Sequence, residues 1–479
     1  MEEPKNNPDS KGQCPLAGFG AEPQSIIRQS LSPFDPLFDA FHEAGFELYA
    51  VGGCVRDWVL GKSPKDIDFT TDALPDETRQ ILASHGYKVI PVGELFGTIA
   101  TIIAHKTYEI TTFRVKESYT RGSRHPIVCY GKSLERDLER RDLTINAMAA
   151  SQNGDIIDPF DGLGDLKAGL LRVPRSSYEK TLEIFGDDPL RILRLARFKA
   201  RLGFKVCDET TRAARDVAGS VLTVSRERWF AEIDGMLRAA DPRAGLDWLC
   251  EIGLFQMLFP EFALLMQSHI QPTSLSGCQA KSCADTLWAQ TIRRIEAASP
   301  ELRWIALFSL VGYASTTNGK WAQTITAMIA GELMSRLKFS NARVDATLKC
   351  LQPLPPGDPQ YRSARELAIS LENEIHDWYA AIQNHLTTLP DNVRTSESER
   401  LSRWHDALAP YFADPKTAEV RMIPGLSQHL TEALGVRGKT LGLCIAHCRE
   451  AILDQKLSES DTIDKYIDWV RDHFEDSGE

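Results

Sequence analysis

Two adjacent glycines near the start of the chain lie in a segment that could hold a phosphorylated ligand. They stand in AVGGCVRDWVLG, which begins at Ala50. The apolar residues before Gly52 predict a strand, and those after Gly53 have helical spacing, so the glycines make a tight turn between the two elements. Backbone N–H groups at the start of a helix attract phosphate, and Arg56 would add positive charge beside them. Turns of this kind also occur without any ligand.

Two alternating aspartates follow in SPKDIDFTT. The alternation of polar and apolar residues predicts a strand, with Asp66 and Asp68 on one face and Ile67 and Phe69 on the other. Carboxylates this close repel each other and are stabilised by a cation, and a set of oxygen ligands favours Mg²⁺. Magnesium held by carboxylates and substrate phosphates is typical of phosphoryl or nucleotidyl transfer. A solvated strand edge is the alternative for an isolated pair.

The glycine turn and the aspartate pair together resemble a known family. GG-C-VRD followed by D-I-D is similar to the nucleotidyltransferase head of the polymerase β superfamily. More narrowly, it resembles the class II tRNA nucleotidyltransferases, or CCA-adding enzymes, and the bacterial poly(A) polymerases. The resemblance implies that Asp66 and Asp68 are catalytic and bind the metal, and that Gly52, Gly53 and Arg56 bind the triphosphate.

A pair of strands and a loop are predicted next. The segment GTIATIIAHKTYEITTF, residues 97–113, predicts two strands with a turn near His105. Glu109 matches the family's Y-E-[VI]-T-T-F pattern and is a candidate third catalytic carboxylate, with an ordinary surface glutamate as the alternative. The polar segment 114–133 contains Gly and Pro and predicts a mobile loop. It resembles the family's flexible loop, which is shortened in relatives that add only C.

The sequence RRDLTINAMA resembles the family's RRDFTINAMA motif almost letter for letter. The family uses this motif to recognise ribose, which implies that Arg140, Arg141 and Asp142 do so here, with Asn146 as local support. The chemistry suits a 2′-hydroxyl group, because a carboxylate accepts a hydrogen bond and a guanidinium donates one. Leu143 replaces the usual Phe.

The segment GDDPLRILRLARFKARLGF, residues 186–204, predicts one amphipathic helix. Asp188 and Arg191 are about one turn apart and can point at the same base. Cytosine and adenine both carry an amine beside a ring acceptor, which suits this pair, whereas uracil and guanine present a carbonyl. The segment resembles the family's EDxxR motif, with Asp187 in place of Glu. Arg194 lies on the same basic face, which would bind nucleotide or RNA, or remain solvated.

Two later segments carry no predicted chemistry. TVSRERWFAEI, residues 223–233, resembles the family's SxERI segment and predicts a capped helix packed on the core. The dipeptide His405-Asp406 suggests a metal-dependent phosphohydrolase of the HD type, but the further His and Asp that such a domain needs are missing around it. A hydrolase is therefore disfavoured.

The composition predicts a globular protein of several domains, with 479 residues of which 43% are hydrophobic. The net charge of -11 argues against general attraction to nucleic acid or anionic membranes, although local basic patches can still bind phosphate. No apolar run reaches the roughly 18 residues of a membrane span, and the start of the chain is acidic and polar, so we expect a cytoplasmic protein with no membrane contact. The ten cysteines are scattered without a zinc-ligand pattern, which predicts reduced thiols.

The predicted fold is an α/β nucleotidyltransferase head, a mixed sheet with helices, followed by an all-α neck, body and tail. The expected parts are a disordered tail (1–30), a catalytic head (31–150), a neck for base recognition (151–235), and a helical body and tail that bind tRNA (236–479).

The function implied by the resemblance is addition of CCA to the 3′ end of tRNA from CTP and ATP, with Mg²⁺ and without a nucleic-acid template. Pyrophosphate would be released. An A-adding enzyme or a poly(A) polymerase shares the same head motifs and is the nearest alternative. A noncatalytic RNA-binding protein built on this fold is the alternative from another class. The sequence carries no indication of oligomeric state.

Overall fold

The fold is taken from a computed structural model of the chain. The residues that the structure describes are 23–90, 97–119, 126–174, 177–262, 287–308, 329–352, 355, 358–386, 391–414 and 418–473. The chain divides into two compact units, residues 1–260 and 261–479.

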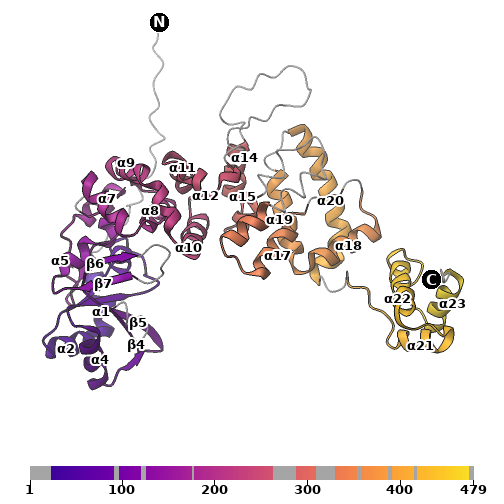
Figure 1. The fold of residues 1–479 in the computed structure, drawn as a ribbon, viewed down its shortest axis with the longest axis horizontal. Coiled ribbons are helices and arrows are strands. Elements are labelled where there is room, and N and C mark those ends of the chain that lie inside the picture. The colour runs from indigo at the N-terminus through magenta and orange to yellow at the C-terminus, as the bar shows by residue number, and fades with distance from the viewer. Residues whose placement is uncertain are drawn as a thin grey trace, which may run out of the picture. The chain divides into compact units, whose positions relative to one another are not determined.

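The first unit is built on a mixed sheet, shown in indigo and violet in Figure 1, and this confirms the predicted α/β head. Seven strands follow one another across it in the order β3 (Lys88–Ile90), β4 (Thr98–Ile103), β5 (Lys106–Thr112), β2 (Asp68–Thr71), β1 (Leu48–Val51), β8 (Ala149–Ala150) and β9 (Ile156–Ile157). Strands β2 and β5 are parallel, and the other neighbours are antiparallel. The central strands are buried, because β1 and β2 are covered by helices on their apolar faces.

The predicted strand, glycine turn and helix are present. Strand β1 ends at Val51, and helix α3 (Gly53–Val59) begins directly after Gly52. Gly52 has φ +82°, a backbone conformation that residues other than glycine rarely adopt. Gly61, two residues beyond the helix, has φ +68° and ends it as expected.

The two strands predicted around His105 are β4 and β5, and the turn between them has positive φ at Ala104 and His105. The prediction of an irregular loop over residues 114–133 was wrong. Strands β6 (Arg114–Tyr119) and β7 (Pro126–Tyr130) form an antiparallel pair, and residues 120–125 lie outside the described part. The Gly and Pro of the segment favoured a loop, although β-branched and aromatic residues in both β6 and β7 favour strands.

The amino-terminal segment was also predicted incorrectly where it is described. Helix α1 (Pro23–Leu31) lies within the expected disordered tail, and its Ile27 and Leu31 side chains are fully buried. Residues 1–22 lie outside the described part of the chain. A proline at the first helical position and two apolar residues one turn apart are sufficient for a helix that packs on the core.

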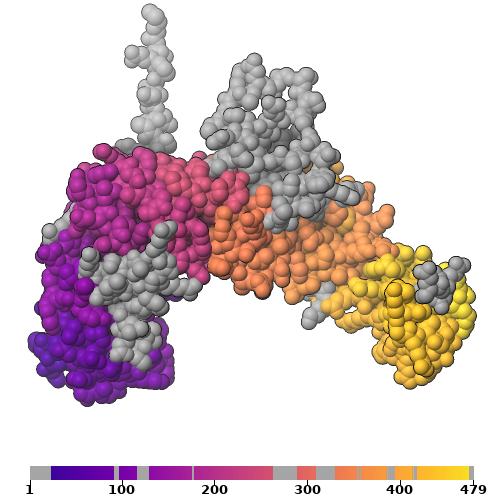
Figure 2. Space-filling view, viewed as in Figure 1, coloured from indigo at the N-terminus to yellow at the C-terminus, as the bar shows by residue number. Residues whose placement is uncertain are grey.

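The neck helices are those that follow the head in the first unit, drawn in magenta in Figure 1. They are α7 (Tyr178–Asp187), α8 (Leu190–Leu202), α9 (Asp208–Asp216), α10 (Arg226–Leu237), α11 (Pro242–Glu251) and α12 (Leu254–Leu258). Helices α10 and α11 both pack on α8. In the space-filling view the head and the neck helices share one continuous packed surface (Figure 2).

The helix predicted over residues 186–204 is α8, with Pro189 at its amino-terminal cap and Gly203 at its carboxyl-terminal cap, but it begins at Leu190 and does not include the aspartates. Asp188 is extended, with φ -146° and ψ 98°, so α7 ends before it and α8 starts after Pro189. A proline excludes the helical conformation at the preceding residue and cannot donate a backbone hydrogen bond. A short parallel pair of strands, β10 (Leu170–Leu171) and β11 (Lys205–Val206), also lies among the helices.

In the second unit, every described element is a helix, as predicted. These are α14 (Leu287–Ala297), α15 (Arg303–Phe308), α17 (Asn341–Cys350), α18 (Tyr361–Leu371), α19 (Ile375–Leu386), α20 (Asp391–Ala413), α21 (Leu426–Leu434), α22 (Gly438–Leu453) and α23 (Ile463–His473), with short 3₁₀ turns. One apolar core forms around Trp378 and Trp404, and another around Tyr466. Among the described helices, none is long and apolar enough to cross a membrane.

Candidate functional site

Three carboxylates of the head form what we call the carboxylate cluster: Asp66, Asp68 and Glu109. Asp68 begins strand β2 and stands opposite Glu109 of the parallel strand β5, so both side chains leave the same face of the sheet. Asp66 precedes the strand by two residues. Within the described residues, none of the three side chains has a hydrogen bond or an ion pair.

The charges of the cluster oppose one another. Partial burial raises the pKa of the Asp68 carboxyl above its ordinary value, and the negative charges of Glu109 and Asp66 raise it further, while Arg141 acts in the opposite direction. A cation would relieve this repulsion. The described residues contain no group of three or more His, Cys, Asp or Glu side chains close enough together to enclose a metal. A site with few protein ligands leaves coordination positions for water and phosphate, which is how Mg²⁺ is commonly bound.

Arg141 lies between the carboxylate cluster and the glycine turn. A Cβ atom added to Gly52 would lie 3.1 Å from Nη1 of Arg141, so glycine is required here by space as well as by its φ. The Nε atom of Arg141 is buried without a hydrogen-bond partner. Its Nη2 donates to Asp137 over 3.0 Å, and Arg140 donates to the other oxygen of that carboxylate over 2.7 Å.

Asp137 is fully buried between the two arginines of the RRD motif. Although burial acts in the opposite direction, Arg140 and Arg141 hold the pKa of its carboxyl far below the ordinary value. Its charge fixes Arg141 beside Gly52. The sequence analysis did not single it out, although Asp137 stands three and four residues before the two arginines, which is the spacing of ion pairs on a helix.

Arg56 lies beside the glycine turn, because its Nη2 is 3.4 Å from the position of a Cβ atom added to Gly53, but it is buried there. Its side chain is only 4% exposed. Its guanidinium donates to Asp57 over 2.7 Å and 2.9 Å, and to Oδ1 of Asn146 over 2.5 Å. Arg56 also lies 5.4 Å from the ring centroid of Phe198 on the neck helix α8. It thus contacts both the RRDLTINAMA segment of the head, at Asn146, and helix α8, at Phe198.

Asp142 continues this connection into the neck. Asn146 donates to its Oδ1 over 3.0 Å, and Arg194 of α8 binds its Oδ2 through two nitrogens at 2.7 Å. Although burial opposes it, Arg194 and Asn146 lower the pKa of the Asp142 carboxyl to about 2. Asp142 is therefore a fixed acceptor.

Glu232 of α10 extends the connection further. It lies 3.6 Å from Arg194 and 2.7 Å from Nε of Arg197. Burial raises the pKa of its carboxyl, with the two arginines acting in the opposite direction. We call the connected set the buried polar network. Its members are Arg56, Asn146, Asp142, Arg194, Glu232 and Arg197.

Asp188 and Arg191 are both buried, but each is bound to another partner. Nη2 of Arg228, on α10, lies 2.6 Å from Oδ2 of Asp188. Arg191 donates through Nη1 to the carbonyl oxygen of Ile184 over 3.1 Å. Both residues adjoin the buried polar network, because Asp188 raises the pKa of Arg194 and Arg191 lowers that of Asp142.

The predicted residues thus fall into two adjoining groups. The first joins the carboxylate cluster to Gly52 and Arg141, with Gly53 at the helix start. The second joins Arg56, Asn146 and Asp142 to Arg194 of α8, beside Asp188 and Arg191. The sequence analysis missed Arg228 and Glu232, because it gave the segment 223–233 no chemistry. Their partners lie some forty residues away in the sequence, at Asp188 and Arg194, so no local spacing could identify them.

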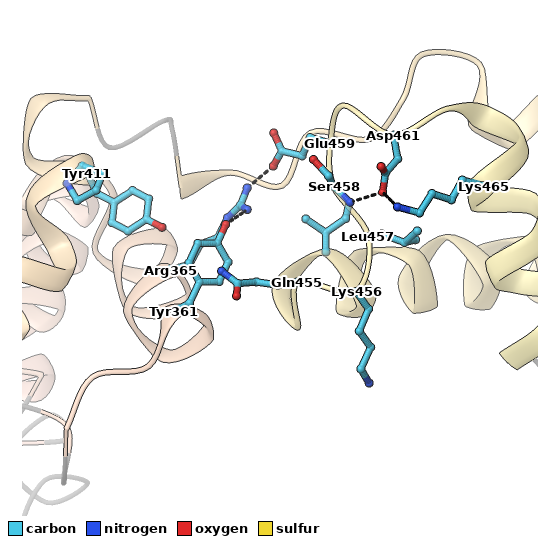
Figure 3. Close-up of a pocket in the computed structure, with 12 residues that line it drawn as sticks. Tyr361, Arg365, Tyr411, Gln455, Lys456, Leu457, Ser458, Glu459, Asp461 and Lys465 are labelled. Atoms are coloured by element: carbon cyan, nitrogen blue, oxygen red, sulfur yellow. Dashed lines mark hydrogen bonds and ion pairs between the residues drawn. The ribbon is translucent and has the colours of Figure 1, made fainter.

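The second unit holds a cavity of about 610 Å³, and its lining includes several charged side chains (Figure 3). Arg365 reaches across it to Glu459, while Asp461 accepts from Lys465 over 2.9 Å. These charges are paired within the cavity wall. Elsewhere in this unit His405 packs on Tyr379 and Phe412, and its Nδ1 lies 3.6 Å from Asp406.

The described cysteines are free, most of them are partly or fully buried, and burial raises the pKa of Cys54 to about 12. Cys14, Cys278 and Cys283 lie outside the described residues.

Comparison with known proteins finds similar sequences for part of the chain. Residues 48–172 match the poly A polymerase head domain, and residues 203–266 match the probable RNA and SrmB-binding site of polymerase A. The CCA-adding enzyme of Lactiplantibacillus plantarum is 37% identical over 223 residues, 47% of this chain and 53% of the relative. That of Streptococcus sanguinis is 39% identical over 223 residues, 47% of this chain and 54% of the relative. The matched part thus spans about half the length of these relatives.

Solved structures agree in fold over nearly the whole chain. The Bacillus stearothermophilus CCA-adding enzyme in complex with CTP has a TM-score of 0.63 at 23% identity, covering 93% of this chain and 98% of that one. The Thermotoga maritima CCA-adding enzyme complexed with tRNA has a TM-score of 0.55 at 19% identity, covering 95% of this chain and 99% of that one.

Proposed function

We propose that this chain is a member of the family of class II tRNA nucleotidyltransferases and bacterial poly(A) polymerases, and that it adds CCA to the 3′ end of tRNA. The proposed substrates are CTP and ATP, with no nucleic-acid template. The 3′-hydroxyl oxygen of the RNA forms a bond to the α-phosphorus, and the bond from that phosphorus to the α–β bridging oxygen breaks. Pyrophosphate leaves with the bridging oxygen, and the hydroxyl proton passes to solvent.

One observation carries this proposal: Arg141 adjoins both the glycine turn and the carboxylate cluster. Its Nη1 lies 3.1 Å from the position of a Cβ atom added to Gly52, and its charge acts against the rise in the pKa of Asp68. A triphosphate bound at Gly52 and Gly53 would therefore have its phosphates beside Asp68. The same RRD segment continues to Asp142, which extends the site toward a ribose and then toward the neck.

Asp66 and Asp68 are the proposed metal ligands, with Glu109 as the third carboxylate of the site. We propose Mg²⁺ as the ion, on the grounds that the candidate ligands are all carboxylate oxygens and that they repel one another. When bound, Mg²⁺ would neutralise these charges and polarise the reacting phosphate.

Selection between nucleotides is assigned to the second group of residues. Arg141 and Asp142 would bind the ribose, with Asn146 and Arg194 holding the carboxylate of Asp142 in place. Asp188 and Arg191 would read the base edge of C or A. In this role Arg191 must release the carbonyl oxygen of Ile184, which it binds in the free protein.

We assign one role to each domain, within the boundaries predicted from the sequence. Residues 31–150 would carry catalysis, residues 151–235 would select the nucleotide, and residues 236–479 would bind tRNA, with the protein acting in the cytoplasm. The fold similarity to enzymes solved with CTP and with tRNA supports this arrangement.

Product sizing tests the proposal. The purified chain is incubated with Mg²⁺ and either tRNA lacking its 3′ end or tRNA ending in CC, with CTP, ATP or both. Growth by CCA followed by arrest is expected. Addition of A only to the CC-ended tRNA would indicate an A-adding enzyme, and a long A tract would indicate a poly(A) polymerase. No extension of either RNA would contradict the proposal.

A further inference from the structure

We infer that Asp137 is a positioning residue that holds Arg141 beside the glycine turn and thereby keeps this cation off the carboxylates proposed to bind the metal. The inference rests on the proposed function, because it concerns the carboxylate cluster as a metal site. Asp137 lies on helix α5 (Leu134–Glu139) and is fully buried. Within the described residues, it is the one hydrogen-bond or ion-pair partner of the Arg141 guanidinium, at 3.0 Å.

The Arg141 guanidinium has a competing place to bind. Its charge reaches Asp68, because it opposes the rise in the pKa of that carboxyl. Its Nε atom is buried without a hydrogen-bond partner, so a donor is left over. In the described part of the chain, the carboxylate cluster has no hydrogen-bond or ion-pair partner of its own. An arginine and a carboxylate pair readily through two nitrogens, and such a pair would occupy the oxygens that a cation needs.

Asp137 is held by other groups besides Arg141. Its Oδ1 atom accepts from the backbone N–H of Arg114 over 3.0 Å, and from Nη2 and Nε of Arg140 over 2.7 Å and 3.2 Å. Arg140 also donates to the carbonyl oxygen of Arg114 over 3.2 Å. These contacts turn Oδ2 toward Arg141. Because the carboxylate is excluded from water, its hydrogen bonds with both arginines are strong.

Two nitrogens of Arg141 thus face different groups. Nη2 is bound to Asp137, and Nη1 lies 3.1 Å from the position of a Cβ atom added to Gly52. The charge of Arg141 therefore faces the turn proposed to bind the triphosphate, while the oxygens of Asp68 stay available. If Arg141 were paired with Asp68, that pair would have to break before a metal could bind, and the apparent affinity would fall in proportion to the fraction of open sites.

The experiment uses the variant Asp137→Asn in the full chain. The amide oxygen can keep the contacts of Oδ1 with Arg114 and Arg140, whereas the amide nitrogen takes the place of Oδ2 and presents a donor to Arg141. Arg141 is then released and free to pair with Asp68. Electron paramagnetic resonance measures the Kd for Mn²⁺ alone, without nucleotide. We expect Mn²⁺ to bind about tenfold more weakly to this variant than to the wild type.

The double variant Asp137→Asn/Arg141→Met separates this role from a structural one. It lacks the competing guanidinium, so its Kd for Mn²⁺ should return to within about threefold of the wild type. A purely structural role of Asp137 would leave the double variant as weak as the single one. Glu139→Gln is the matched control, because Glu139 is a buried carboxylate on the same helix and pairs with Arg136 over 3.2 Å. Its Kd should equal that of the wild type.

An unchanged Kd in a folded Asp137→Asn variant would overturn the inference, and so would a weakened Kd that Arg141→Met does not restore. Thermal melting shows whether each variant is folded. If Asp137→Asn does not fold, Arg141→Met alone decides. It should tighten Mn²⁺ binding about threefold at most, and a larger gain would overturn the inference, because it would show Arg141 already bound at the cluster in the wild type.

Failure of the proposed metal site is distinguishable from failure of this inference. A wild-type chain that binds no Mn²⁺, or an Asp68→Asn variant that binds it equally well, would contradict the metal site itself. Binding that depends on Asp68 but is the same in Asp137→Asn would contradict only the role of Asp137.

Discussion

The carboxylate cluster and the buried polar network hold their charges in opposite ways. Asp66, Asp68 and Glu109 have no side-chain partner in the described part of the chain, and burial, together with repulsion from Glu109 and Asp66, raises the pKa of Asp68. Asp142 is bound by Arg194 and Asn146, and its pKa is lowered to about 2. The carboxylate cluster needs a cation to neutralise its charges. In the buried polar network, arginines already pair with the carboxylates.

This difference separates two kinds of contribution to the proposed reaction. Repelling carboxylates reduce stability in the free protein and gain from a bound metal. A network of paired charges keeps its donors and acceptors fixed, so little reorganisation is needed when a nucleotide binds. We therefore expect substitutions in the cluster to affect activity more than stability, and substitutions in the network to affect both.

The largest effect is expected for Asp68→Asn. The substitution keeps the shape of the side chain but removes the charge that would hold the metal, so kcat/KM for CTP should fall about 1000-fold, or about 4 kcal/mol. The melting temperature should remain equal or rise, because the repulsion from Glu109 is relieved. Transfer assays and thermal melting measure the two effects.

Asp76→Asn is the control for that substitution, since Asp76 is an exposed acid of α4 (Pro75–Ser84) paired with Arg79. Its activity should match the wild type. An active Asp68→Asn variant would show that the cluster is not the metal site.

Arg194→Met should break the buried polar network. It leaves the carboxylate of Asp142 without its ionic partner, and loss of one member of a buried pair costs about 3 kcal/mol of folding stability. Urea unfolding measures the change. Arg201→Met is the matched control on the same helix, because Arg201 is half exposed and lies 3.5 Å from Asp57, so its loss should cost at most about 0.5 kcal/mol. Equal costs for the two variants would remove the distinction between the network and an ordinary surface pair.

Arg191→Ala tests base reading within the same region. Loss of its donors should relax the preference for C and A over U and G about tenfold and lower the rate of transfer. Competition assays with mixed nucleotides give the ratio. Unchanged selectivity would count against the assignment of Arg191 to the base.

The smallest expected effect is an opposite pH dependence of stability in the two regions. The pKa of Asp142 is lowered to about 2 from about 3.9 when unfolded, so its contribution is present above about pH 4 and lost as the pH falls toward 2. The pKa of Asp68 is raised, so its contribution is present below the unfolded pKa and lost as the pH rises through the folded pKa.

Urea unfolding at pH 5 and at pH 3 measures both contributions. Asp142→Asn should reduce the loss of stability on acidification, whereas Asp68→Asn should increase it. The same change in both variants would contradict the contrast between the two regions.

Local patterns in the sequence were sufficient for much of the head. The strand, glycine turn and helix around Gly52 were predicted because the glycine conformation and the apolar periods are properties of adjacent residues. The hairpin of β4 and β5 was predicted for the same reason. The strands β6 and β7 were missed because Gly and Pro between them outweighed two short strand-forming runs.

The partners of the site residues were not predictable in this way. Asp188 and Arg191 were expected to face a base together, but Pro189 moves Asp188 out of the helix and Arg228 binds it. Arg56 was expected beside the glycine turn and lies there, but its partner Asn146, ninety residues later, was not expected. Such contacts depend on how α3, α8 and α10 pack, which the spacing of residues within one segment does not specify.

Binding of Mn²⁺, used as a paramagnetic substitute for Mg²⁺, tests the central claim most directly. Electron paramagnetic resonance would count the ions bound by the wild type and by Asp68→Asn in the presence of CTP, with Asp76→Asn as the control. The account predicts bound Mn²⁺ in the wild type and the control, and its loss in Asp68→Asn. Equally tight binding of Mn²⁺ by Asp68→Asn would contradict the account.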